Sequence, residues 1–91
     1  MLDFDAFCDA VQRRVLELID VPEMAFVTGT GRCVWTLGDA TVVMTALTRT
    51  EVGVGATFAG VQESVDTQMD DLGVNVAAGF IARQLSRGLS G

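Results

Sequence analysis

The first twenty residues carry apolar side chains at the spacing of a helix. Asp3 is suited to cap its N-terminus, and Pro22 is expected to end it, because proline disfavours helical backbone in the residue before it. The apolar residues of this segment recur every three or four positions and so share one helical face: Phe4, Phe7, Cys8, Val11, Val15, Leu18 and Ile19. The pattern predicts an amphipathic helix over residues 3–20.

Residues 23–48 change to an alternating pattern. Three runs are rich in β-branched and aromatic residues, which is typical of strands: EMAFVT, RCVWTL and ATVVMTALT. Glycine-containing segments at 29–31 and 38–39 separate them as tight hairpin turns, the second with the composition of a type II′ turn. We expect an antiparallel meander with one face under helices and the other, rich in valine and threonine, half-covered. Trp35 alternates in phase with Cys33 and Leu37, so it is predicted to lie in the core.

The next segment is ambiguous. Residues 51–58 alternate as in a fourth strand, yet Val52 and Ala56 are also four residues apart, as at the start of a helix. From about 60 to 72 the helical interpretation is favoured, because Val61, Val65 and Met69 follow one another at steps of four.

A final helix is expected from about residue 75. Gly73 would cap or bend the helix before it, and Asn75 would cap the new one. Its inward side chains are predicted to be Val76, Phe80, Ile81, Leu85 and Leu89. The chain is thus expected to form one small α+β domain over residues 1–91. It would have an N-terminal helix, an antiparallel β-meander of three or four strands, and a C-terminal helix or helix pair.

Composition adds an expectation of self-association. Apolar residues make up 49% of the 91 residues, while a domain of this size buries only about two-thirds of its unfolded surface. A second copy is the simplest cover for the remainder, because large exposed apolar patches are rare on monomers. No membrane partner is expected, since the longest uncharged stretches are 11 residues each and a spanning helix needs about 20.

Missing residue types narrow the chemistry. The chain has no histidine and no lysine, which removes imidazole acid–base catalysis, Schiff-base chemistry and the lysine of a phosphate-binding loop. Hydroxyl nucleophiles therefore lack a base, and we expect no enzyme activity. The net charge of −6 argues against direct nucleic-acid binding, which needs a basic surface.

The two cysteines match no familiar motif. Cys8 and Cys33 are 25 positions apart, which fits no metal or redox spacing. The acidic N-terminus lacks the basic region of a signal peptide. Both cysteines are therefore interpreted as reduced thiols of a cytoplasmic protein, with Cys8 facing the core.

Three glycines raise the question of a phosphate-binding loop. The spacing of Gly53, Gly55 and Gly60 meets neither the dinucleotide motif nor the P-loop motif, and no cofactor is expected. Gly53 and Gly55 would lie on the same side of an extended strand. They predict a flat close-packing groove for a helix or another subunit.

Four carboxylates form the remaining candidate site. Glu63, Asp66 and Asp70 would share one stripe of the predicted helix, with Asp71 beside it. The simplest interpretation is a solvated face; the alternative is an acidic ridge that docks a basic protein surface. No metal is predicted, because no EF-hand spacing is present.

Three functions are consistent with these patterns. The first is a non-enzymatic interaction module or structural subunit that works as a homo-oligomer. The second is a small acidic inhibitor or adaptor, of the kind that phages and mobile elements encode, docking through the acidic helix stripe. The third is a small-molecule-binding domain with a closed apolar pocket between sheet and helices.

Overall fold

The computed structural model describes residues 2–89, which form a helix, five strands and a second helix. The elements are α1 (Phe4–Leu18), β1 (Ala25–Gly29), β2 (Arg32–Leu37), β3 (Ala40–Ala46), β4 (Glu51–Phe58), β5 (Val61–Gln68), α2 (Asp71–Ser86) and the short 3-10 helix η1 (Arg87–Leu89). The predicted α+β class, with an N-terminal helix, an antiparallel meander and a C-terminal helix, is confirmed. The sheet has one strand more than the longest meander expected.

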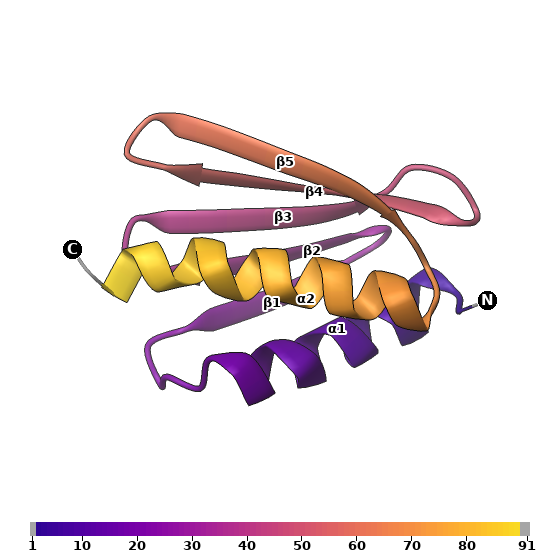
Figure 1. The fold of residues 1–91 in the computed structure, drawn as a ribbon, viewed down its shortest axis with the longest axis horizontal. Helices are drawn as coiled ribbons and strands as arrows, with labels where there is room; N and C mark the ends of the chain where they lie inside the picture. Colours follow the sequence, from indigo (N-terminus) through magenta and orange to yellow (C-terminus); the bar gives the residue numbers. More distant parts are fainter. Residues whose placement is uncertain (1, 90–91) are drawn as a thin grey trace.

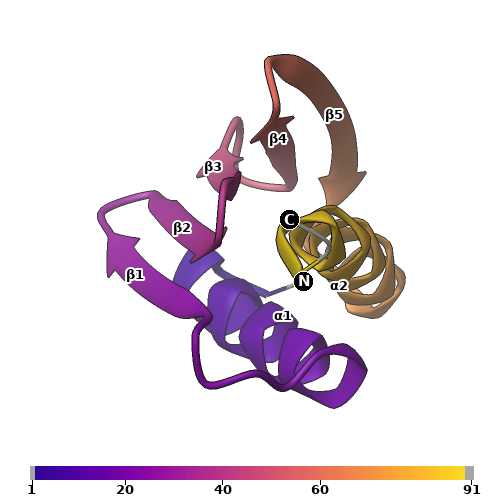
Figure 2. The same ribbon diagram turned by 90° about the vertical axis from the view of Figure 1, so that its left-hand side faces the viewer.

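The sheet has two unlike faces. Its strands follow one another in sequence order, and each neighbouring pair is antiparallel. Both helices lie on the same face (Figures 1 and 2). Figure 2 also shows that the sheet curls around α2, so its other face is convex. We call this second face the outer face.

Helix α1 forms where the apolar pattern predicts it. The Asp3 side chain accepts a hydrogen bond from the Ala6 backbone N–H at 2.8 Å and so caps the helix. The helix ends at Leu18, because Ile19 adopts an extended backbone with φ −148°. Its buried residues, Phe7, Cys8, Val11 and Val15, are among the expected ones. Leu18 is predicted on the same face but is 48% exposed, so that placement is wrong.

Trp35 anchors the core, as predicted. Its side chain is fully buried, and its indole N–H donates to Gln12 Oε1 of α1 at 2.5 Å. The Phe26 ring lies 4.9 Å from it, centroid to centroid, on the neighbouring strand. The indole thereby fills the space between the sheet and α1 without leaving its N–H unpaired.

Turn chemistry explains the hairpins. Gly38 has φ +58° and Asp39 does not share the left-handed conformation, which is the type II′ geometry expected from the sequence. At the β4–β5 turn both Ala59 (φ +53°) and Gly60 (φ +80°) are left-handed, as in a type I′ turn. Alanine there costs about 1–2 kcal/mol, so this turn has a weak signal in the sequence.

The helix predicted over residues 60–72 is wrong. Residues 51–58 form strand β4, and Val61–Gln68 form strand β5 beside it, in register from Phe58↔Val61 to Glu51↔Gln68. Steps of four residues fit a helix, but four is also an even number, so Val61 and Val65 share one face of a strand as well. Pairing with the free edge of β4 decides between the two.

Helix α2 begins earlier than predicted. Its N-cap is Asp70, whose side chain accepts from the Gly73 N–H at 2.8 Å, so Asn75 is not the cap. Gly73 lies in the first turn and neither ends nor bends a helix before it. A Cβ at Gly73 would overlap the backbone carbonyl of Gln68. The close approach of β5 to α2 therefore requires glycine at this position.

The inward face of α2 agrees only in part with prediction. Phe80, Ile81 and Leu85 are buried as expected. Val76 and Leu89 face outward instead, with 45% and 53% of their surface exposed. The buried face also includes small residues, among them Ala77 and Ala78, which let the helix lie close to the sheet.

The interpretation of the cysteines as reduced thiols is wrong, because Cys8 and Cys33 form a disulfide. Both residues are buried, so the core-facing placement of Cys8 is confirmed. Packing of α1 against the inner face of β2 brings the two together, and spacing along the chain does not reveal this. The cytoplasmic location stays a prediction, without the support of free thiols, since disulfides are typical of oxidising compartments. Within residues 2–89, no helix is long and apolar enough to cross a membrane.

Candidate interaction surface

The outer face of the sheet is made of small and β-branched residues. Along the central strands every second side chain points away from the helices, and these residues are half-buried or exposed within the chain. We call the following set the outer patch: Val34, Thr36, Thr41, Val43, Thr45, Gly53, Gly55 and Thr57. None of its members is charged. The half-covered, Val- and Thr-rich face expected from the sequence is therefore present on the side away from both helices.

Strand register arranges this face in three rows that run across β2, β3, β4 and β5. The apolar row is Val34, Val43, Gly55 and Ser64; the charged row is Arg32, Thr45, Gly53 and Asp66; the hydroxyl row is Thr36, Thr41, Thr57 and Gln62. Directly paired residues of antiparallel strands lie about 4.5–5.5 Å apart and contact one another. Each row is thus a line of neighbouring residues, and the lines through Gly53 and Gly55 lack a side chain at β4.

A hollow lies over β4, between the side chains of β3 and β5. It is lined by Val43, Gly55 and Ser64 among others. A Cβ at Gly55 would meet no heavy atom within 4 Å, whereas one at Gly53 would lie 3.1 Å from Asp66 Oδ1 and 3.3 Å from Leu47 Cδ1. Both glycines are on the outward side of β4, but only the position at Gly55 is open, because the Asp66 and Leu47 side chains lie beside Gly53. The packing of another surface against them stays a prediction.

The four candidate carboxylates do not form a helical stripe. Glu63 and Asp66 lie on β5, on opposite faces of the sheet, because their separation is an odd number of residues. Asp70 is the N-cap of α2, and Asp71 is its first residue. The predicted stripe is wrong because residues 61–68 are extended, and a docking role for these groups stays a prediction.

Glu63 is held by α2 and η1. Gln84 Nε2 donates to Glu63 Oε2 at 2.5 Å, and Arg87 Nη2 donates to Oε1 at 3.1 Å. Gln84 is buried, with 2% of its surface exposed. The hydrogen bond from Gln84, followed by the bond and charge of Arg87, holds the pKa of Glu63 below its ordinary value of 4.5. Both carboxylate oxygens are therefore used within the chain, which the sequence did not reveal.

We expect this cluster to make folding stability pH-dependent. Because the folded pKa of Glu63 is lowered, its contribution is present above pH 4.5 and is lost as the pH falls through the folded value. Glu63→Gln should lower the unfolding midpoint at neutral pH, and the difference from the wild type should shrink below that window. Urea unfolding across the acid range measures this, with Glu23→Gln at an exposed position as the control. A difference that stays constant down to about pH 3 would contradict the linkage.

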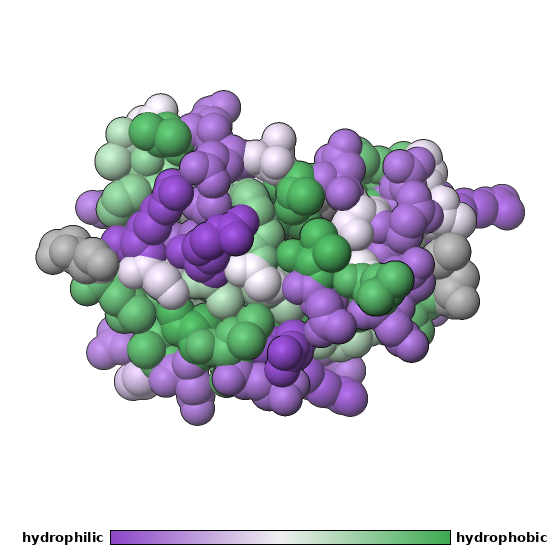
Figure 3. All heavy atoms as spheres, in the orientation of Figure 1, coloured by the Kyte–Doolittle hydropathy of each residue, from purple (hydrophilic) through white to green (hydrophobic). Residues whose placement is uncertain are grey.

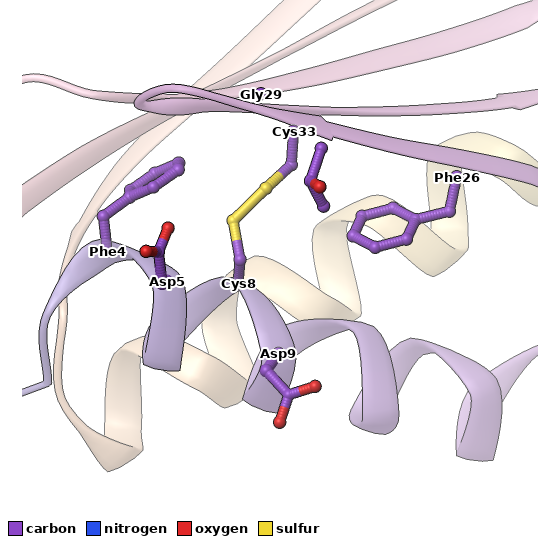
Figure 4. Close-up of a pocket in the computed structure, with 8 residues that line it drawn as sticks. Phe4, Asp5, Cys8, Asp9, Phe26, Gly29 and Cys33 are labelled. Atoms are coloured by element: carbon purple, nitrogen blue, oxygen red, sulfur yellow. A yellow bond between two sulfur atoms is a disulfide. The ribbon is translucent and has the colours of Figure 1, made fainter.

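A second hollow lies between α1 and the β1–β2 hairpin. It measures about 340 Å³ and is lined by Phe4, Phe26 and the disulfide, among others. Figure 4 shows the two rings on either side of the sulfur atoms. The hollow is open to solvent, and its carboxylates, Asp5 and Asp9, are exposed. It differs from the closed pocket with buried polar groups that a small-molecule site requires.

The helices also expose apolar residues, but charged residues of the same helices stand beside them. Figure 3 shows these apolar side chains in groups with polar ones between them. They include Leu16, Leu18, Leu72 and Val76, at 41%, 48%, 77% and 45%. Scattered exposed apolar residues are normal on a protein surface. The outer patch is accordingly the better candidate for a contact.

No protein-family model matches the chain, and neither does any curated protein or solved structure. In the part of the chain that the structure describes, no group of three or more His, Cys, Asp or Glu side chains could hold a metal ion. The outer face is therefore the feature of the molecule that bears on its function.

Proposed function

We propose that the protein is a non-enzymatic interaction or structural subunit that works as a homo-oligomer. The outer patch carries this proposal. Its valines and threonines lie on the face opposite both helices. They form an uncharged area on a chain whose net charge is −6. An uncharged face that is only half-covered within the chain is suited to contact with another surface.

Charge distribution favours a second copy as the partner. Copies of an acidic protein repel one another through most of their surface. The outer patch itself is uncharged. On the same face the charged row adds one cation, Arg32, and one anion, Asp66, and Glu51 at the start of β4 adds a second anion. This face carries little of the chain's charge, so two copies approach there with less repulsion than elsewhere.

The β5 edge of the sheet is less suited to self-association. The edge strand β5 carries Glu63 and Asp66, and Asp70 and Asp71 follow it. Charged residues on an edge strand oppose pairing with another chain. An acidic adaptor that docks through these same carboxylates is the alternative function, although Glu63 is already bonded within the chain.

We expect the protein not to be a monomer at micromolar concentration. Light scattering over a hundredfold dilution range should give a mass that is a multiple of 9.6 kDa at the upper concentrations. Raising the salt concentration should leave the mass unchanged or increase it, because apolar contacts are not screened. A mass of 9.6 kDa throughout the range would refute the proposal. Salt-labile capture of a basic protein by the monomer would support the acidic adaptor instead.

A further inference from the structure

We infer that the outer patch binds the outer patch of a second copy about a two-fold axis that runs parallel to the strands, between β3 and β4. This inference rests on the proposed function and adds the geometry of the contact. A two-fold dimer uses the same surface on both copies, so that surface must be complementary to itself. Two features of the outer face satisfy this condition.

The first feature is shape. Rotation about an axis along the strands keeps each row at its own level and exchanges β3 with β4. It therefore places Val43 of one copy over Gly55 of the other, where an added side chain meets no heavy atom within 4 Å. Thr45 likewise faces Gly53, and Thr41 faces Thr57, by the same register. Of these three side chains of β3, Val43 is the one that enters the open part of the hollow, at Gly55, and it does so twice in the dimer.

The second feature is charge. The same rotation exchanges β2 with β5, so Arg32 of one copy faces Asp66 of the other, again twice. Both side chains are exposed, and neither forms an ion pair with another residue of the range 2–89. The outer face is convex (Figure 2), so the copies separate towards β2 and β5, and the long arginine side chain is suited to span that gap. Such pairs fix the register of a contact more than its strength.

Neighbouring axes satisfy neither feature. An axis along β3 would set Val43 against its own counterpart and Arg32 opposite Gly53. An axis along β4 would place Gly55 of one copy opposite Gly55 of the other and leave the hollow empty. With the axis between the two strands, the sheets can pack face to face with nearly aligned strands, as twisted sheets do. Shape and charge thus select the same axis.

A charge exchange tests the register. Arg32→Asp and Asp66→Arg each place like charges together twice in a homodimer, and each should weaken the dimer roughly tenfold or more. An equimolar mixture of the two variants should recover the wild-type dissociation constant, since both pairs of the mixed dimer are then of opposite charge. Sedimentation of each variant and of the mixture measures this. Failure of the mixture to recover would overturn the inferred axis.

Filling the hollow tests the contact itself. A Cβ at Gly55 meets no heavy atom within 4 Å in the monomer, and valine favours strands. The Gly55→Val monomer should therefore fold, while its side chain blocks entry of Val43. Gly79→Ala is the control. It also adds a side-chain atom where no heavy atom lies within 4 Å, but on α2, on the side of the sheet away from the outer face (Figure 2). We expect Gly55→Val to abolish dimerisation and Gly79→Ala to preserve it.

The outcomes separate the inference from the proposed function. A wild type that is monomeric throughout refutes both. A wild-type oligomer that tolerates Gly55→Val, or whose charge variants do not complement each other, overturns this interface and leaves the homo-oligomer proposal standing. Unfolding curves of each variant at concentrations below dimerisation show that the monomer is intact.

Discussion

Gly73→Ala should destabilise the protein by roughly 3 kcal/mol or more, the range of severe backbone overpacking. The residue lies in the first turn of α2, where a Cβ would overlap the carbonyl of Gln68 at the end of β5. The obstacle is backbone and not the end of a flexible side chain, so β5 or α2 would have to move. Helix propensity predicts the opposite sign, since alanine is favoured over glycine by about 0.5–1 kcal/mol.

Gly79→Ala is the matched control for this prediction. It lies in the same helix, and an added Cβ there meets no heavy atom within 4 Å. Without an overlap, helix propensity is the only effect of the substitution, so this variant should gain about 0.5–1 kcal/mol of stability. Chemical denaturation of both variants gives the comparison. If Gly73→Ala were stabilised as much as Gly79→Ala, β5 and α2 could not approach as closely as described.

Loss of the Cys8–Cys33 disulfide is expected to have the second large effect. The bond connects residues 25 positions apart, and the loop-closure entropy of a loop of that length corresponds to about 3.5 kcal/mol. Reduction of the wild type, or the double substitution Cys8→Ala and Cys33→Ala, should lower stability by roughly that amount. Both sulfurs lie between α1 and β2. Loss of the bond should therefore loosen the packing of α1 against the sheet.

The double variant also serves as the control. Its unfolding midpoint should not respond to reductant, whereas that of the wild type should. If reductant left the wild type unchanged, and a thiol reagent modified two free cysteines on unfolding without reduction, the disulfide would be absent. The interpretation of the cysteines as reduced thiols would then stand.

Elements with one strong local pattern were predictable from the sequence. Helix α1 repeats its apolar positions over four turns and has a capping aspartate, Asp3. Strands β2 and β3 alternate clearly because one of their faces is covered and the other is not. For these segments the short-range pattern and the tertiary environment require the same conformation.

Strand β5 was not predictable, for a specific reason. It is an edge strand with little buried surface, so its alternation is weak. Its apolar residues Val61 and Val65 stand four apart, a spacing that fits both periods. The turn before it contains Ala59 in a left-handed conformation, a residue that rarely marks such a turn. Only the free edge of β4, which offers unpaired backbone groups, selects the strand.

The arrangement of the outer face was likewise predictable from the sequence only in part. Alternation alone placed Gly53 and Gly55 on one side of an extended segment and assigned valine and threonine to the face away from the helices. The alignment of Val43 beside Gly55, and of Arg32 in the row that ends at Asp66, depends on strand register, which arises from pairing between segments.

The sequence by itself determined the α+β class, the amphipathic first helix, the core position of Trp35 and the two-sided character of the central strands. These depend on periodicity within a few consecutive residues. Tertiary structure alone decided the fifth strand, the start of α2, the bond between Cys8 and Cys33, and the bonds from Gln84 and Arg87 to Glu63. Those partners are 21–25 positions apart. Burial of a shared core brings them together, and no local pattern encodes that distance.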